Sequence, residues 1–234
     1  MSQVVLVAGG TGGLGRAVSL AFLEQGAQVT VTYRNASELA SLKTAAGSRA
    51  AALAGNSVDA TDETAVRALV EGIVAKDGRL DALVNTVGGY FGGVKLWDVA
   101  VKDFDRMIAL NLRAGFVLSR AVVPAMLKQG KGAIVNIAAR TAFDHAAGAA
   151  AYTASKAGVV ALIDSLAADL HGTGVRANSV LPSIIDTETN RKAMPSANFA
   201  KWPKPEDIAR VILFLCSDDA ALVSGASIPV YGDS

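Results

Sequence analysis

Short apolar runs alternate with longer segments of helical pattern along the whole chain. The short runs are rich in Val, Ile, Leu and Ala, which is typical of strands buried on both faces of a parallel sheet. Strands that alternate with helix-length segments indicate βαβ units. We therefore expect an α/β fold with a doubly wound, seven-stranded parallel sheet and helices on both faces. The strands are expected at 4–8, 28–33, 50–55, 82–86, 132–138, 176–181 and 226–230, and the helices near 13–25, 36–46, 61–76, 102–129, 149–171 and 205–216.

Residues 182–205 form the longest stretch without a regular pattern. A loop of this length in a compact domain is usually functional, and often a lid over a site. Its Pro, Asn and charged residues also suit a plain solvated excursion. Both interpretations stay open at this point.

Composition adds few constraints. Hydrophobic residues make up 51% of the chain and the formal net charge is +1, so no nucleic-acid-binding surface or polybasic membrane segment is expected. No apolar stretch is expected to reach membrane length, and a cytoplasmic protein is the default expectation. Cys216 is the one cysteine and lies in an apolar helical run, so we expect a buried structural thiol. No His, Cys and carboxylate cluster has metal-ligand spacing, so no metal is expected.

The N-terminal segment carries the first candidate site. The apolar run 4–8 is followed by the glycine-rich turn 9–15 and then by a helical run. Strand, glycine-rich turn and helix in this order are typical of a dinucleotide-binding start, in which free backbone amides at the helix N-terminus hold a pyrophosphate. The spacing Gly9-x-x-x-Gly13-x-Gly15 differs from the Gly-x-Gly-x-x-Gly fingerprint. A merely flexible turn is the alternative.

Tyr152 and Lys156 are the second candidate site. They stand four residues apart in an Ala-rich helical segment, so both side chains lie on one helix face. A nearby ammonium favours a phenolate and lowers the pKa of a tyrosine, which ordinarily lies near 10. We therefore interpret the pair as a general acid and base.

Together these motifs resemble the short-chain dehydrogenase/reductase family over nearly the whole chain. The matching segments fall in the family's order: residues 8–15 for Thr-Gly-x-x-x-Gly-x-Gly with Ala8 for Thr, 85–88 for Asn-Asn-Ala-Gly, Asn111 for the catalytic Asn, Tyr152 with Lys156, and 182–187 for Pro-Gly-x-x-x-Thr with Ser183 for Gly. The resemblance implies a Rossmann-type fold, a nicotinamide cofactor, hydride transfer to a small molecule, and a homodimer or homotetramer formed through the two long helices at 102–129 and 149–171. It also implies one domain over 1–234, with a cofactor half of about 1–130 and a catalytic and substrate half of about 131–234.

The resemblance assigns roles residue by residue. Tyr152 donates a proton, Lys156 lowers the pKa of Tyr152 and binds the ribose, and Asn111 kinks its helix and holds a proton-relay water. Alternatively, Asn111 is an inward side chain satisfied by backbone, and Asp59 caps the helix near Thr61 instead of binding adenine. The implied cofactor-binding residues are Gly9, Thr11, Gly13, Leu14, Gly15, Tyr33, Arg34, Asp59, Ala60, Asn85, Gly88, Tyr152, Lys156, Pro182, Ile185 and Thr187.

Cofactor choice is expected to follow from the end of the second strand. NAD-specific enzymes place an acidic residue there, which bonds the ribose hydroxyls. Here Tyr33 stands at the acidic position and Arg34 follows it. A guanidinium matches a 2′-phosphate, which a carboxylate would repel. We expect NADP(H) to be preferred, with NAD(H) possible.

One departure from the family concerns catalysis. The resemblance places a catalytic Ser thirteen residues before Tyr152, where this chain has Ala139. The segments 88–93 and 181–202 resemble dihydropteridine reductase, which also lacks that Ser, so a pterin-like ring is the first expectation for the substrate. A ketone or quinone reductase, an alcohol dehydrogenase and a cofactor-binding sensor without turnover are the alternatives. The candidate substrate residues are Tyr90, Ala139, His145 and Trp202, and Thr141 or Asp144 could replace the missing donor.

Overall fold

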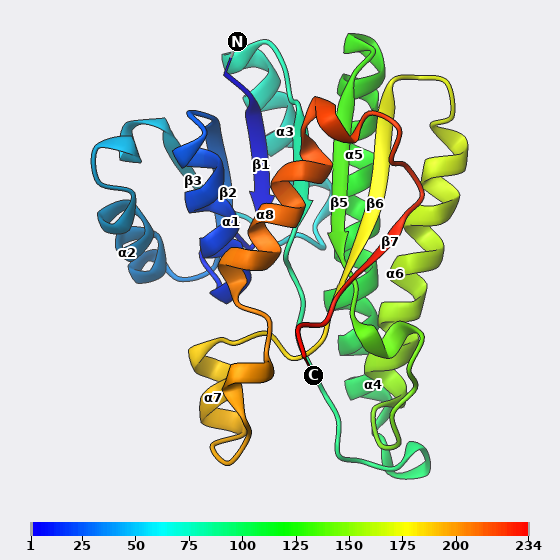
Figure 1. Ribbon diagram of the computed structural model, residues 1–234. Coiled ribbons are helices and arrows are strands. Elements are labelled where there is room, and N and C mark those ends of the chain that lie inside the picture. Colours follow the sequence, from blue (N-terminus) through cyan, green and yellow to red (C-terminus); the bar gives the residue numbers. More distant parts are fainter. Residues whose placement is uncertain (1, 234) are drawn as a thin grey trace.

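A computed structural model describes residues 2–233 of the chain. Seven strands form one sheet and every neighbouring pair is parallel, which confirms the predicted seven-stranded parallel sheet. The strand order is β3-β2-β1-β4-β5-β6-β7. Figure 1 shows the strands running side by side, with their carboxyl ends toward the lower edge. The strands are β1 (Val4–Ala8), β2 (Gln28–Tyr33), β3 (Leu53–Ser57), β4 (Ala82–Asn85), β5 (Gly132–Ile137), β6 (Val175–Pro182) and β7 (Ser227–Val230).

Helices cover both faces of the sheet (Figure 1). Alternate residues of each strand face opposite sides, so Leu6 belongs to one apolar cluster and Val5 and Val7 belong to the other. One cluster includes side chains from α1 (Gly13–Glu24), α2 (Ala36–Ala46) and α8 (Pro205–Cys216). The other includes side chains from α3 (Glu63–Asp77), α5 (Ala114–Gln129) and α6 (Ala150–Asp169). The smaller helices α4 (Val101–Met107) and α7 (Glu188–Ala193) lie at the carboxyl edge.

The strand order reverses between β1 and β4. From β1 the chain proceeds outward to β2 and β3, returns to β4, and then proceeds to β5, β6 and β7 on the other side. In open α/β sheets such a switch point leaves a crevice at the carboxyl ends of the strands, where ligands bind. The ends of β1, β4 and β5 stand in register there, with Ala8 beside Asn85 and Asn85 beside Asn136.

Several boundaries differ from the sequence expectations. The third strand begins at Leu53 instead of residue 50, because Gly47–Ala52 form a 3₁₀ helix, η1. The helix expected from about residue 61 begins at Glu63, and Asp62 caps it by accepting hydrogen bonds from the amides of Thr64 and Ala65. The alternative in which Asp59 caps this helix is therefore wrong.

The long helix expected at 102–129 is interrupted. A π-turn, η3 (Ile108–Arg113), separates α4 from α5 and contains Asn111. Such turns contain an extra residue per turn and occur frequently at functional sites. The expected irregular stretch 182–205 also contains structure, namely α7 and the 3₁₀ helix η5 (Phe199–Lys201).

Among the described residues, one helical span, Val101–Gln129, is long and apolar enough by length and composition to cross a membrane. The expectation that no stretch reaches this length is wrong by that measure. The span covers one face of the sheet, and 44% of its apolar window is buried. Core helices of soluble proteins pass the same test.

Candidate functional site

The glycine-rich turn brings the chain into close contact with itself. Gly9 has a φ of 72°, and a Cβ on Gly15 would collide with the carbonyl oxygen of Gly9. Helix α1 begins directly after this turn, with Gly12 as an N-cap that supplies no side-chain bond and with no acid in the first turn. The first amides of the helix therefore lack a side-chain acceptor, and they carry the positive end of the helix dipole. The turn fits an anion such as a pyrophosphate.

Tyr152 and Lys156 both lie in the first two turns of α6 and are shielded from water. Lys156 Nζ donates to the carbonyl oxygen of Ile137 at 2.7 Å and lies 6.0 Å from the centre of the Tyr152 ring. Burial lowers the pKa of Lys156 to about 8. Burial, with a smaller contribution from Tyr90, raises the pKa of Tyr152 to about 12. Lys156 is not among the causes of this shift, so burial determines the direction of the Tyr152 pKa in the chain alone. A lowering of that pKa by Lys156 stays a prediction.

Asn111 joins the β4 loop to α6 from inside the π-turn. Its side chain accepts from the amide of Gly89 at 2.9 Å and donates to the carbonyl oxygen of Gly89 at 3.1 Å. Asn111 Nδ2 also donates to Ser155 Oγ at 2.9 Å, and the Ser155 hydroxyl donates to the carbonyl oxygen of Tyr152 at 2.7 Å. Asn111 is therefore an inward side chain with backbone partners, as the alternative interpretation expected, and it is also linked to Tyr152.

Gly88 marks the point where these groups converge. A Cβ on Gly88 would lie 2.9 Å from Asn111 Oδ1 and 3.3 Å from Lys156 Nζ. A loop from β4, a π-turn and helix α6 thus bring together residues that are far apart in the sequence. Asn85, at the end of β4, is buried and donates to Asn136 Oδ1 of β5 at 2.7 Å.

Ala139 is buried directly after β5, at the start of the 3₁₀ helix η4 (Arg140–Ala142). Two hydroxyls from neighbouring parts of the chain, Thr141 Oγ1 and Thr153 Oγ1, are buried and find no hydrogen-bond partner within residues 2–233. His145 is exposed, and its Nδ1 lies 3.2 Å from the carbonyl oxygen of Thr141. Asp144 pairs with Arg140 at 3.1 Å and so is engaged already.

The second strand ends beside the third at the candidate adenine side. Tyr33 pairs in register with Ser57, and Arg34 is exposed. Asp59 accepts from the amide and the hydroxyl of Thr61, both at 2.8 Å. These two bonds and the charge of Arg34 hold the pKa of Asp59 below its ordinary value. Ala60 beside it is buried.

The segment 182–205 reaches the glycine-rich turn. Thr187 caps α7 by accepting from the amide of Asn190, and a Cβ on Gly13 would lie 2.8 Å from its Cγ2. Pro182 ends β6 and is buried, and Ile185 packs against the core on the α1 and α8 side. The structure thus brings all the predicted cofactor residues to the carboxyl edge of the sheet.

Trp202 differs from the rest of the candidate substrate residues. It is buried and packs against Phe199, with ring centres 4.9 Å apart. This packing stabilises the segment 182–205 and leaves little ring surface for a ligand.

Sequence reasoning missed three residues at this edge. Ser155 connects Asn111 to Tyr152, as described above. Arg16 of α1 donates to Ser41 Oγ of α2 at 3.3 Å, and Thr11 Oγ1 donates to Glu38 Oε2 of α2 at 2.9 Å. Arg16 was detectable because it directly follows the glycines, whereas Glu38 and Ser155 required the folded chain.

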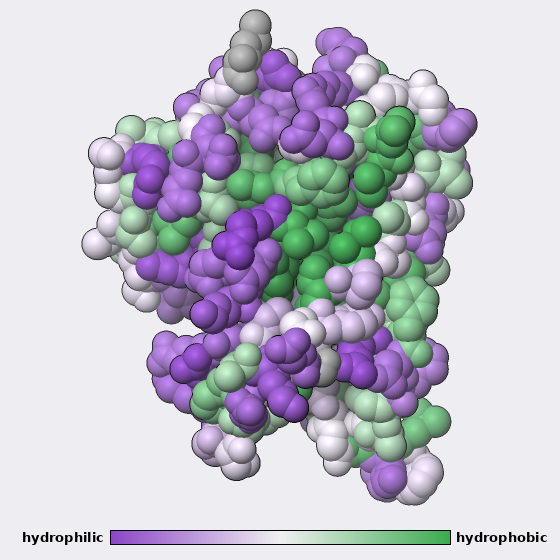
Figure 2. Space-filling model, in the orientation of Figure 1, coloured by the Kyte–Doolittle hydropathy of each residue, from purple (hydrophilic) through white to green (hydrophobic). Residues whose placement is uncertain are grey.

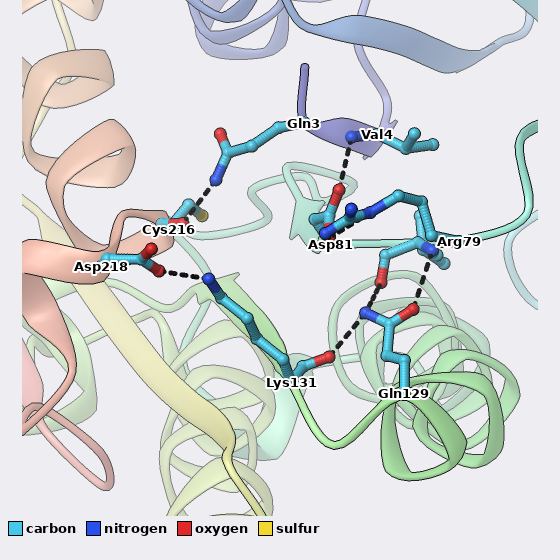
Figure 3. A network of polar contacts seen from close by, with 9 residues as sticks. Gln3, Val4, Arg79, Asp81, Gln129, Lys131, Cys216 and Asp218 are labelled. Carbon is cyan, nitrogen blue, oxygen red and sulfur yellow. Dashed lines mark hydrogen bonds and ion pairs between the residues drawn. The ribbon is translucent and has the colours of Figure 1, made fainter. Parts of the chain in front are cut away.

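The opposite, amino edge of the sheet contains a cavity of about 920 Å³. Its wall includes a polar network shown in Figure 3. Asp81 accepts from the amide of Val4 at 2.8 Å and from Arg79 Nε at 2.9 Å, and Lys131 pairs with Asp218 at 2.6 Å. None of the predicted site residues lines this cavity. Within residues 2–233 no group of three or more His, Cys, Asp or Glu side chains could hold a metal ion.

Comparisons with known proteins agree with this geometry. A family model described as short chain dehydrogenase matches residues 3–198. D-threitol dehydrogenase of Mycolicibacterium smegmatis is 34% identical, with 98% of this chain and 92% of that protein covered. The 3-oxoacyl-[acyl-carrier-protein] reductase FabG of Thermotoga maritima is 33% identical, with 98% and 96% covered. The structure of ElxO with NADP bound matches with a TM-score of 0.93 at 29% identity, covering 99% of this chain and 98% of that one. The chain therefore belongs to the short-chain dehydrogenase family of oxidoreductases.

Proposed function

We propose that the protein is an NADP(H)-dependent oxidoreductase whose general acid is Tyr152. The observation that carries this proposal is the convergence of Asn111, Lys156 and Gly88 beside Tyr152 at the carboxyl edge. The glycine-rich turn at the same edge fits the pyrophosphate of a dinucleotide. When bound, the cofactor supplies the hydride.

The residues of the chain then handle the proton. Tyr152 holds a proton at neutral pH, because its pKa is raised to about 12, and it can donate that proton to a substrate atom. The Lys156 ammonium has three N–H donors and Ile137 takes one of them, so it can bond a ligand hydroxyl as well. With a pKa of about 8 it is also able to exchange a proton near neutral pH.

Three observations support NADP(H) over NAD(H). The end of β2 carries no carboxylate at Tyr33, and Arg34 follows it with an exposed guanidinium. Arg16 supplies a second cation from α1 near α2. Among the similar solved structures, ElxO was solved with NADP bound and, as a variant, with NADPH bound.

For the substrate we propose a conjugated, pterin-like ring. Ala139, which corresponds to the catalytic Ser by the spacing to Tyr152, offers no hydroxyl, and a conjugated ring can spread developing charge over its heteroatoms. A ketone or quinone reductase, or an alcohol dehydrogenase, is the second candidate. The Thr141 hydroxyl favours this second candidate, because it is buried without a partner among the described residues and could replace the missing Ser as a donor. A sensor that binds cofactor without turnover is the third.

One assay separates these candidates. NADPH oxidation is measured with quinonoid dihydropterin and with a panel of ketones and quinones, for wild type and for Ala139→Ser. Dihydropterin turnover by wild type with no gain on ketones in Ala139→Ser supports the first candidate. A gain of tenfold or more on ketones, with no dihydropterin turnover by wild type, supports the second, since one oxyanion donor is worth about 10²–10³ in rate. Cofactor binding without any turnover leaves the sensor.

We further propose a single-domain, cytoplasmic protein that forms a dimer or tetramer. Both halves of the chain contribute strands to one sheet, which supports a single domain. Phe104, Phe116 and Leu127 are exposed on α4 and α5. Figure 2 shows apolar residues gathered over α8 and β7. Phe214 of α8 and Leu222, which precedes β7 in the chain, are exposed. Two apolar faces would suit a two-fold dimer and then a tetramer.

Light scattering at micromolar concentration tests this assembly. We expect at least a dimer for wild type and a smaller assembly for Phe116→Glu. Ala45→Glu, which adds the same single charge at an exposed position of α2, is the matched control. A monomeric wild type would contradict the proposal.

A further inference from the structure

Tyr90 is exposed, yet its position is tightly defined. It lies in the loop after β4, where Gly89 makes two hydrogen bonds with the Asn111 side chain. Further along the loop, the amide of Val94 donates to the carbonyl oxygen of Gly148 at 3.2 Å. The Tyr90 ring lies over Gly92, where a Cβ would collide with its hydroxyl. The loop is thus anchored on both sides of Tyr90, and Gly92 leaves room for the ring.

This position brings Tyr90 against the general acid. The ring centres of Tyr90 and Tyr152 are 5.0 Å apart with an interplanar angle of 73°, an edge-to-face contact. Tyr90 is 66% exposed, whereas Tyr152 is only partly accessible. Tyr90 therefore forms an outer cover over one side of Tyr152, between that ring and water.

We propose that the ring of Tyr90 is a positioning element that fixes the Tyr152 side chain and keeps water from it. The proposal rests on the proposed role of Tyr152 and adds a residue that acts through it. The shape of the ring performs this task, so the Tyr90 hydroxyl is dispensable. The cover belongs to the loop Gly89-Tyr90-Phe91-Gly92 and not to the Tyr152 and Lys156 pair itself.

Few charged groups near Tyr152 could change its pKa in place of the Tyr90 ring. The titratable groups that face Tyr152 are Tyr90 from the β4 loop and Lys156 from its own helix. On the segment after β5, Arg140 and Asp144 pair with each other, and His145 contacts the backbone of Thr141. Burial is the largest cause of the raised pKa of Tyr152. Removal of the covering ring should therefore lower that pKa through hydration.

A titration of Tyr152 that needs no turnover tests the cover. The protein is labelled with fluorotyrosine, whose phenol ionises at lower pH, and ¹⁹F spectra are followed against pH while circular dichroism confirms the fold. The Tyr152 signal is assigned by its loss in Tyr152→Phe. We expect the midpoint in Tyr90→Ala to fall by about one pH unit or more relative to Tyr90→Phe. Equal midpoints in these two variants would overturn the proposal.

Gly92→Ala offers an independent route to the same change. A methyl group there should displace the Tyr90 ring and leave its chemistry intact, so the Tyr152 midpoint should fall as it does in Tyr90→Ala. Trp97→Ala, which removes an exposed aromatic ring from the same loop, is the matched control and should leave the midpoint unchanged. A midpoint in Gly92→Ala equal to that of wild type would count against the cover.

Steady-state kinetics with the substrate found in the assay above give the second readout. We expect kcat to fall tenfold or more in Tyr90→Ala, with NADPH affinity unchanged within twofold, and to stay within threefold of wild type in Tyr90→Phe. Equal losses in Tyr90→Phe and Tyr90→Ala would show that the hydroxyl acts, and would overturn the proposal. A wild type without turnover would count against the proposed function alone, because the ¹⁹F titration still decides the cover.

Discussion

The two edges of the sheet differ in whether their polar side chains are all engaged with one another. At the amino edge the charged and amide side chains bond with one another and with main-chain groups: Arg79 with Asp81, Lys131 with Asp218, and Gln129 with the carbonyl oxygen of Leu80. At the carboxyl edge the Lys156 ammonium is buried with no carboxylate partner among the described residues, and two threonine hydroxyls are buried without partners. The comparison teaches that polar groups satisfied by each other stabilise the fold, whereas groups left available can bind and react.

The largest expected effect is at the carboxyl edge. Tyr152→Phe removes the proposed proton donor, so kcat should fall by about 10²–10⁴. NADPH affinity, measured by fluorescence titration, should change little. Turnover within threefold of wild type would show that Tyr152 is not the acid and that this edge does not act as proposed.

At the amino edge, Asp81→Asn should reduce stability and leave chemistry intact. Asp81 accepts hydrogen bonds from both Val4 and Arg79, and bonds to a charged group are each worth about 1.5–3 kcal/mol. We expect the free energy of unfolding in urea to fall by about 2 kcal/mol, with kcat per folded molecule unchanged. Asp219→Asn alters an exposed carboxylate on the same cavity wall and should change stability by less than about 0.5 kcal/mol. A loss of kcat in Asp81→Asn would break the division between the edges.

Cofactor preference comes next in size. Arg34→Ala should weaken NADPH binding by about tenfold or more and leave NADH binding nearly unchanged, because one charge-assisted bond to the 2′-phosphate is lost. Glu38→Gln removes a carboxylate that is bonded to the glycine-rich turn, so it should increase the preference for NADPH over NADH. Isothermal titration with both cofactors measures the ratio. Identical wild-type affinities for NADPH and NADH would contradict the assignment.

The smallest effect sharpens the comparison most directly, because it tests whether the carboxyl edge costs stability. Burial lowers the pKa of Lys156 from 10.5 to about 8, so between these values the unfolded chain binds more protons and stability rises with pH. The full loss of stability that comes from burying the Lys156 ammonium is therefore present below pH 8. A pKa shift of this size corresponds to a destabilisation of about 3 kcal/mol. A variant without the ammonium regains this free energy but loses the hydrogen bond to Ile137, which is worth about 1.5 kcal/mol.

Lys156→Met should thus be more stable than wild type at pH 7 by about 1–2 kcal/mol. The difference should shrink as the pH rises from 8 toward 10.5. Urea unfolding at several pH values measures both. A variant less stable than wild type at pH 7 would mean that Lys156 is structural.

The fold was predictable because apolar runs and helical patterns alternate without interruption. The positions of the glycine-rich turn and of the Tyr152 and Lys156 pair followed from local spacing. The direction of the Tyr152 pKa did not, because sequence spacing indicates proximity and does not indicate burial. The family resemblance predicted a kink at Asn111, but the local pattern indicated one continuous helix there. The contact between the Tyr90 and Tyr152 rings was not predicted, since it joins segments far apart in the chain. The start of the third strand, predicted at residue 50 and found at Leu53, is a smaller error at one boundary.

The π-turn at Ile108–Arg113 also determines how the gene for this protein can change length. Each residue of an α-helix advances the chain by about 100°. Deletion of one residue here would let a continuous α-helix form and would rotate α4 by about that angle relative to α5. Asn111 would then turn away from Gly89 and Ser155, although no side chain of the proposed site had been substituted. A substitution of Arg113, which is exposed in this turn, should therefore be accepted, whereas single-codon deletions and insertions should be removed by selection.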